Sequence, residues 1–171
     1  ADVKRLSDKA ANFFRSRGIG KGDTVLVILQ RRWEYWTTLM ALAKLGAIAI
    51  PATHMLMEKD IVYRMEKARV KMIVAVSEDE LCDNILKAVK KVSSPVQAVC
   101  VGKREGFIDY TEETEKQSET LDIPYKNERS AGDTILVYFT SGTTGMPKMV
   151  ALPQRYTLGH IAVSYTHLRA H

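Results

Sequence analysis

The sequence predicts an α/β protein with a mainly parallel sheet flanked by helices, followed by the first strands of a second subdomain. Two observations lead to this prediction. Short, continuously apolar runs alternate with amphipathic segments of helical length, an order that favours right-handed crossovers between parallel strands. The apolar runs also lack regular polar alternation, which is typical of strands that are covered by helices on both faces.

The first four elements follow from apolar spacing and from residues that end helices. In chain order they are a helix at 3–17, a strand at 24–29, a helix at 33–45 and a strand at 47–51. The first helix has an apolar stripe at helical spacing and ends at Gly18 and Gly20, and Gly46 stops the second helix. Pro51 closes the second strand, because proline cannot extend a central ladder.

The next four elements repeat the alternation. They are a charged amphipathic helix at 58–68, a strand at 71–76, a helix at 78–91 and a strand at 97–101. Beyond Gly102 the chain becomes polar and acidic, with TEETEKQSET as the extreme, and no strong periodicity remains. We therefore predict a polar surface excursion at 102–132 that ends an N-terminal subdomain comprising residues 1–132.

A loop rich in glycine and hydroxyl groups lies between two further predicted strands, at 133–139 and 149–153. Successive backbone N–H groups in such a loop can form a concave site for an anion, above all phosphate. Glycines permit close approach to a ligand, and Lys148 adds a mobile positive charge that suits a polyphosphate. The candidate phosphate-binding residues are Thr140, Ser141, Gly142, Thr143, Thr144, Gly145, Pro147 and Lys148.

The loop does not match the generic nucleotide-binding motifs. A P-loop needs G-x-x-x-x-G-K-[ST] before a helix, whereas here the spacing is Gly142-x-x-Gly145-x-x-Lys148, with no Ser or Thr after the lysine. The dinucleotide fingerprint G-x-G-x-x-G is also absent. From the residues alone, the segment is a phosphate-binding loop in an exposed hairpin or a glycine-rich turn without a ligand.

The segment YFTSGTTGMPKMV resembles the signature of the adenylate-forming superfamily, which includes acyl-CoA synthetases, firefly-type luciferases and peptide-synthetase adenylation domains. The stretches GIGKGDTVLVIL and ALAKLGAIAIPATHML are similar to the N-terminal subdomain of this family. GAIAIPATHMLMEKDIVYR and YTLGH resemble the acetyl- and medium-chain acyl-CoA synthetase branch. The resemblance covers residues 2–162.

The resemblance implies an ATP-dependent, AMP-forming acyl-CoA ligase. In this family a carboxylate, here a short- or medium-chain fatty acid, attacks the α-phosphorus of ATP with Mg²⁺, and pyrophosphate leaves. Coenzyme A then takes the acyl group from the acyl-adenylate. The loop would hold the β- and γ-phosphates, and His160, in YTLGH, would lie on the substrate side. The expected partners are therefore small molecules: the carboxylate, ATP and coenzyme A.

The chain is expected to be an N-terminal piece of a longer enzyme, which we call the parent protein. The family's metal-binding Glu, ribose-binding Asp and catalytic Lys have no counterpart here, so no catalytic and no metal-binding residue is assigned, and the chain alone is expected to be inactive. Residues 133–162 would begin the second subdomain. The final VSYTHLRAH, residues 163–171, is identified as the translation of a sequencing adapter and interpreted as an artefactual tail.

Two other readings stay open at this point. The parent protein could be another adenylating ligase that activates an aryl acid or an amino acid. The isolated chain could be a non-catalytic nucleotide-binding fragment. The metal-binding Glu and catalytic Lys in the full gene would separate an enzyme from a binder.

Composition excludes several other classes of protein. The net charge is +5, and no basic block interrupts the mixed charges, so nucleic-acid binding is not expected. No apolar run has transmembrane length and no signal peptide opens the chain. The two cysteines, Cys82 and Cys100, lack metal-ligand spacing and are predicted to be reduced and buried. These features predict a cytoplasmic protein.

Several conspicuous side chains are interpreted structurally rather than functionally. The tryptophans at 33 and 36 and the methionines at 55, 57 and 65 are predicted to pack in the core. His54, in a loop after a predicted strand, is expected to be structural or solvated. The acidic run at 111–120 is expected to be a solvated surface.

Overall fold

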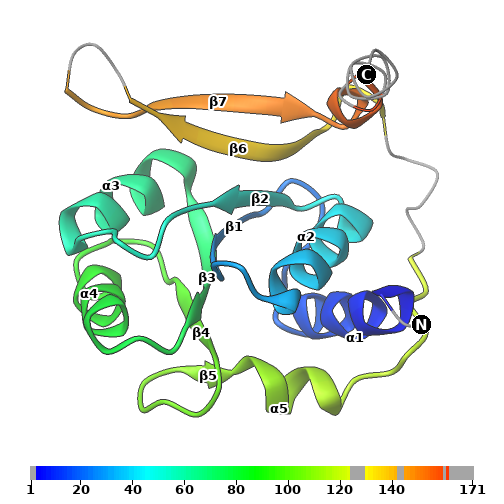
Figure 1. Ribbon diagram of the computed structural model, residues 1–171, viewed down its shortest axis with the longest axis horizontal. Coiled ribbons are helices and arrows are strands. Elements are labelled where there is room, and N and C mark those ends of the chain that lie inside the picture. Colours follow the sequence, from blue (N-terminus) through cyan, green and yellow to red (C-terminus); the bar gives the residue numbers. More distant parts are fainter. Residues whose placement is uncertain (1–2, 124–129, 142–144, 160, 162–171) are drawn as a thin grey trace, which may run out of the picture.

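The structure is a computed structural model that describes residues 3–123, 130–141, 145–159 and 161. Figure 1 shows one sheet with helices on both of its faces. The strands are β1 (Thr24–Ile28), β2 (Ile48–Pro51), β3 (Val70–Val76), β4 (Gln97–Val101), β5 (Ile108–Asp109), β6 (Thr134–Thr140) and β7 (Lys148–Pro153). The helices labelled in Figure 1 are α1 (Val3–Ser16), α2 (Trp33–Leu45), α3 (Glu58–Ala68), α4 (Asp79–Val89) and α5 (Tyr110–Glu115).

The sheet confirms the predicted fold class. Its strand order is β5-β4-β3-β1-β2-β6-β7, and every neighbouring pair is parallel except β6 and β7, which are antiparallel. In Figure 1, α1, α2 and α5 cover one face and α3 and α4 cover the other. This three-layer arrangement explains why the central strands are continuously apolar.

The core lies on both faces of β1 and β3. Residues 25–28 of β1 are fully buried, as are Met72 and Ile73 of β3. On the α1 side, Phe13 and Phe14 are also fully buried. Gly46 ends α2 as predicted: its φ is 70°, in the left-handed region, and the Ala47 N–H donates to the Leu42 carbonyl at 2.9 Å.

The prediction of a polar surface excursion at 102–132 is wrong for residues 108–115. β5 pairs in parallel with β4, and α5 packs against α1. Tyr110, 2% exposed, meets the Phe13 ring edge-on with centroids 5.8 Å apart, and its hydroxyl lies 2.9 Å from Thr38 Oγ1. Burial raises the pKa of Tyr110 to about 12. Because α5 has only six residues and Tyr110 is its one buried side chain, its sequence shows no hydrophobic periodicity from which the helix could be predicted.

Asp109 caps this short helix, which gives a testable prediction. Its Oδ1 accepts hydrogen bonds from the Thr111 and Glu112 N–H groups at 2.9 and 3.1 Å. Asp109→Ala should therefore lower the free energy of unfolding by about 1 kcal/mol, measured by urea denaturation. The control is Asp122→Ala, which removes an exposed carboxylate that caps no helix. Equal stability of the two variants would contradict the capping role.

The predicted core packing of both tryptophans and of two methionines is wrong. Trp33 and Trp36 are 56% and 62% exposed, because α2 buries another stripe of its surface, made of Thr38, Ala41, Leu42 and Leu45. Met55 and Met57 lie exposed between β2 and α3, whereas Met65 of α3 is buried as predicted.

Two further expectations from the sequence are confirmed within the described residues. Cys82 and Cys100 are buried and not disulfide-bonded, and burial raises the pKa of the Cys100 thiol to about 11. His54 is exposed. Over the part of the chain that is described, no helix is long and apolar enough to cross a membrane.

Candidate functional site

The candidate phosphate-binding loop leaves the sheet at the carboxyl end of β6. Since β6 is parallel to β2, and β2 to β1 and β1 to β3, this end lies at the same edge of the sheet as the loops that follow those strands. In open α/β sheets, ligands bind outside the carboxyl ends of the strands. The fold therefore places the loop at the edge where a ligand is expected.

The loop is the tip of a β-hairpin, as predicted. β7 returns antiparallel to β6, with Thr140 opposite Lys148 and Tyr138 opposite Val150. Thr140 Oγ1 donates to the Lys148 carbonyl at 3.5 Å across the base of the loop. This base is built from two regular strands, so the ends of the loop are fixed in space.

The described part of the loop is open to solvent. Ser141, Gly145 and Met146 are exposed. Gly145 has a φ of 91°, and a Cβ added there would meet no atom within 4 Å. A side chain at this position would therefore be disfavoured by backbone strain and not by a clash. Gly142, Thr143 and Thr144, together with His160 and residues 163–171, lie outside the described residues.

Lys148 carries the mobile charge at this site. It is exposed, and among the described residues no carboxylate lies within ion-pair distance of its amine. As the cross-strand partner of Thr140 it projects from the same face of the hairpin. Phe139 projects from the opposite face, towards α3, so Thr140 and Lys148 face the α2 side. A charge in this position is available to an anion held by the loop.

Helix α3 supports the loop from the other face, a contact that no sequence pattern predicts. The Tyr63 hydroxyl donates to the Pro147 carbonyl at 2.9 Å, and its ring packs edge-on against Phe139 with centroids 6.0 Å apart. The Arg64 guanidinium lies 5.1 Å from the centre of the same Phe139 ring. Burial lowers the pKa of Arg64 below its usual range. Both stems of the loop therefore contact one helix.

The Tyr63 contact predicts that this helix restrains the loop. Tyr63→Phe keeps the ring packing and removes the hydrogen bond to Pro147. We expect the free energy of unfolding to fall by about 0.5–1.5 kcal/mol and amide exchange to accelerate at Met146 and Lys148. Hydrogen-exchange mass spectrometry measures the local effect. Tyr35→Phe, which removes a hydroxyl on α2, is the matched control, and equal acceleration in both variants would contradict the restraint.

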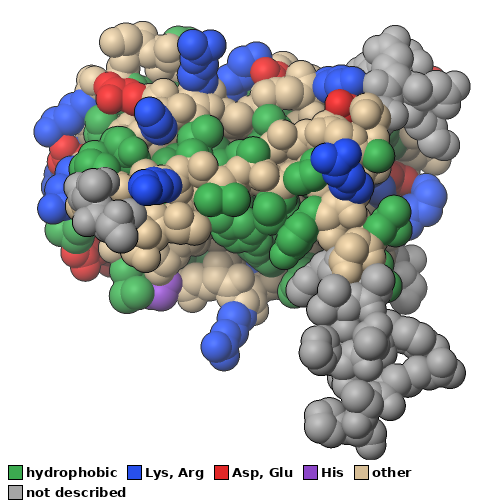
Figure 2. Space-filling view, turned by 90° about the horizontal axis from the view of Figure 1, so that it is seen from above, with side chains coloured by type: hydrophobic (Ala, Val, Ile, Leu, Met, Phe, Trp, Pro, Cys, Tyr) green, Lys and Arg blue, Asp and Glu red, His purple; other side chains and the backbone are tan. Residues whose placement is uncertain are grey.

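The hairpin also exposes apolar surface. Figure 2 looks onto β6 and β7 and shows apolar side chains gathered on this side of the molecule. Tyr138, Met149 and Val150 are each 39–42% exposed, and β7 is the edge strand of the sheet. The hairpin is therefore much less covered than the central strands.

The described residues offer no protein site for a metal ion. Among them no group of three or more His, Cys, Asp or Glu side chains is arranged to hold one. The polar groups at the loop are hydroxyls, backbone amides and one ammonium, which are donors suited to an anion. The described groups of the loop are therefore of the kind that suits a polyphosphate ligand.

Comparison with known proteins gives a family match over nearly the whole chain. Residues 1–170 match the family described as AMP-binding enzyme. The mitochondrial acyl-coenzyme A synthetase ACSM5 of Rattus norvegicus is 34% identical over 94% of this chain, and ACSM4 of Mus musculus is 32% identical over 96%. The chain spans only 28% and 27% of the lengths of these two relatives.

Solved structures share the fold. An anthranilate CoA ligase, AuaEII, in complex with anthranoyl-AMP superposes with a TM-score of 0.81 at 21% identity, covering 90% of this chain and 29% of that one. A luciferase-like enzyme from the mealworm Zophobas morio has a TM-score of 0.78 at 22% identity, covering 95% and 38%.

The prediction of a cytoplasmic protein is wrong. The curated relatives from rat, mouse and human are all named mitochondrial. The features used for that prediction were the absence of a signal peptide and of a long apolar run, and neither distinguishes the cytoplasm from the mitochondrial matrix.

Proposed function

The chain belongs to the AMP-binding enzyme family, and from this premise we propose that its parent protein is an ATP-dependent, AMP-forming acyl-CoA ligase. The curated relatives are acyl-coenzyme A synthetases. Because the chain spans about a quarter of their length, the complete reaction belongs to the parent protein. The observation that carries the proposal is the hairpin loop with an exposed Lys148 at the carboxyl edge of the sheet.

The loop binds the β- and γ-phosphates of ATP in this proposal. Hydroxyl groups and backbone amides of residues 140–145 hold the phosphate oxygens, and Lys148 offsets part of their charge. A carboxylate attacks the α-phosphorus, the bond to the bridging oxygen breaks, and pyrophosphate leaves from the loop. Negative charge develops on the pyrophosphate as it leaves. The loop residues therefore contribute by positioning the phosphates and by stabilising this charge electrostatically.

The remaining groups come from outside the described residues. Mg²⁺ would enter with ATP and neutralise part of the phosphate charge, and its protein ligand is not assigned here. Coenzyme A then takes the acyl group from the adenylate through its thiol, with release of AMP. The names of the relatives support a location in the mitochondrion for this reaction.

The substrate is proposed to be a short- or medium-chain fatty acid. The names of the relatives support an acyl substrate, and the chain length is taken from the resemblance of GAIAIPATHMLMEKDIVYR and YTLGH to the acetyl- and medium-chain branch. A second candidate is an aryl acid, because the structural neighbour with a TM-score of 0.81 is an anthranilate CoA ligase. The adenylating reaction would be the same for both acids.

The test is an assay of the full-length parent protein with ATP, Mg²⁺ and one acid at a time: octanoate, anthranilate or an amino acid. We expect octanoate to support pyrophosphate exchange without coenzyme A, and acyl-CoA and AMP to form in equal amounts once coenzyme A is added. Release of ADP would contradict the proposal, and a preference for anthranilate would favour the aryl acid. The 171-residue chain alone is expected to be inactive.

A further inference from the structure

The end of the β6–β7 hairpin extends beyond the strand beside it. β6 pairs with β2 at Ala49 and Leu136, four positions before Thr140, so the described residues next to the loop have no partner on β2. Figure 1 shows α3 beneath this end of the hairpin. From Tyr138 to Pro153, every hydrogen bond and ring contact that joins the described part of the hairpin to the rest of the protein is made with α3.

Two side chains of α3 hold Phe139, the residue before Thr140. The Tyr63 ring meets the Phe139 ring edge-on, with centroids 6.0 Å apart, and the Arg64 guanidinium lies 5.1 Å from the centre of the same ring. Arg64 Nη1 also donates to the Asp60 carbonyl at 2.9 Å, one turn back on α3, which fixes the guanidinium against the ring. Aromatic and cation–π contacts of this geometry favour one position of the ring. They therefore hold the strand where the loop begins.

The Tyr63 hydroxyl holds the peptide group that precedes Lys148. It donates to the Pro147 carbonyl at 2.9 Å, and this carbonyl and the Lys148 N–H belong to one planar peptide group. A hydrogen bond to the carbonyl therefore restricts the direction in which the chain continues through the Lys148 Cα. On the other side, the Lys148 carbonyl accepts a hydrogen bond from Thr140 Oγ1 at 3.5 Å. The backbone of Lys148 is thus held at both of its peptide groups.

The side chain of Lys148, in contrast, is available to a ligand. It is exposed, and its amine forms no ion pair or hydrogen bond with the described residues. A lysine on a backbone that is already fixed loses less conformational entropy on meeting an anion than a lysine on a backbone that must first be ordered. The contacts with α3 therefore preorganise Lys148 for an anion.

We propose that two residues of α3, Tyr63 and Arg64, set the ATP affinity of the site by positioning Lys148. Tyr63 acts through the Pro147 carbonyl, and Arg64 acts through the Phe139 ring. Both are positioning residues and not phosphate ligands, because the ring that they contact lies on the face of the hairpin opposite Lys148. This inference rests on the proposed function, since it assigns the two residues to the phosphate site.

The test is a double-mutant cycle in the parent protein, with the affinities of ATP and AMP measured by calorimetry. Tyr63→Phe keeps the ring packing and removes the hydrogen bond to Pro147, so ATP should bind about three- to tenfold more weakly. AMP affinity should be unchanged, a result that a general loss of folding would not produce. In the Lys148→Ala background, Tyr63→Phe should change ATP affinity by less than about twofold, because the charge that it positions is gone.

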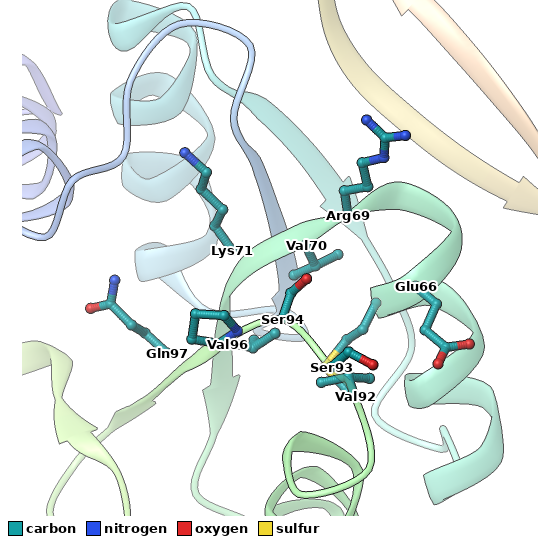
Figure 3. A pocket seen from close by; sticks show the side chains of 11 residues that line it. Glu66, Arg69, Val70, Lys71, Val92, Ser93, Ser94, Val96 and Gln97 are labelled. Atoms are coloured by element: carbon teal, nitrogen blue, oxygen red, sulfur yellow. The ribbon is translucent and has the colours of Figure 1, made fainter.

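Arg64→Gln tests the second contact and has a matched control on the same helix. It removes the guanidinium from the Phe139 ring and should weaken ATP binding by about two- to tenfold. Arg69→Gln makes the same chemical change at the other end of α3. Figure 3 shows Arg69 next to Val70, where β3 begins, on the wall of a separate pocket. ATP affinity should stay within about twofold of wild type in this control.

The outcomes separate this inference from the proposed function. If Lys148→Ala leaves ATP affinity unchanged, the phosphate site is wrong and the inference falls with it. If Lys148→Ala weakens ATP binding but Tyr63→Phe does not, the phosphate site stands and the positioning role is wrong. The positioning role is also wrong if the two effects multiply in the double variant, or if Arg64→Gln and Arg69→Gln give equal ATP affinities.

Discussion

Lys148→Ala in the parent protein is expected to slow carboxylate-dependent pyrophosphate exchange by about ten- to a hundredfold. The substitution removes one charge-assisted contact to the β- and γ-phosphates, worth about 1.5–3 kcal/mol. Lys148 makes no ion pair within the described residues, so its removal leaves no carboxylate without a partner in the free protein. The substitution should therefore slow the reaction with ATP and leave the free energy of unfolding nearly unchanged.

The control for this prediction is Lys67→Ala, which removes an exposed lysine of α3, away from the loop. Its exchange rate should be unchanged. The transfer of the acyl group from a preformed acyl-adenylate to coenzyme A should also be nearly unchanged in the Lys148 variant, because pyrophosphate has already left. Wild-type exchange rates in the Lys148 variant would contradict the role assigned to this residue.

Phe13→Ala is expected to cause the largest loss of stability, about 3–5 kcal/mol. Phe13 is fully buried and contacts two aromatic rings, with centroids 5.3 Å away for Phe14 and 5.8 Å for Tyr110. Its removal leaves a cavity between α1 and α5 and weakens the contact that holds α5. Urea denaturation of the two proteins measures the change.

Trp36→Ala is the matched control, since it removes a larger ring that is 62% exposed. It should change the free energy of unfolding by less than about 0.5 kcal/mol. If Phe13→Ala and Trp36→Ala lowered the free energy of unfolding by similar amounts, Trp36 would be buried in solution, which would contradict its exposed position on α2.

The sequence predicted the regular elements well because each boundary has a local cause. The helices at 33–45 and 58–68 and the strand at 97–101 have the bounds observed for α2, α3 and β4. Gly46 ends α2 with the expected positive φ. Apolar periodicity and helix-ending residues act over a few positions, so they can be read without knowledge of the tertiary structure.

The errors arose where tertiary contacts override local patterns. The acidic segment after β4 shows no hydrophobic periodicity. Nevertheless, Tyr110 packs against Phe13 and its hydroxyl hydrogen-bonds with Thr38, and these contacts anchor β5 and α5 to the rest of the protein. Trp33 and Trp36 have large hydrophobic side chains, but α2 buries a different face, which includes Ala41, Leu42 and Leu45. Neither outcome follows from propensity alone.

The candidate site was predicted only in part. Strand propensity and loop composition predicted the hairpin, and the signature identified the loop. The contacts of Tyr63 and Arg64 with residues 139 and 147 join segments more than seventy positions apart. Such long-range pairs depend on how β6 docks beside β2, which the sequence of α3 does not encode locally.

The central claim is that the hairpin loop binds the β- and γ-phosphates of ATP, and one measurement tests it most directly. The affinities of ATP and AMP are measured by calorimetry for the wild-type parent protein and for its Lys148→Ala variant. Binding through the β- and γ-phosphates predicts that ATP affinity falls by about ten- to a hundredfold while AMP affinity is unchanged. An equal change for both nucleotides, or none for ATP, would contradict the claim.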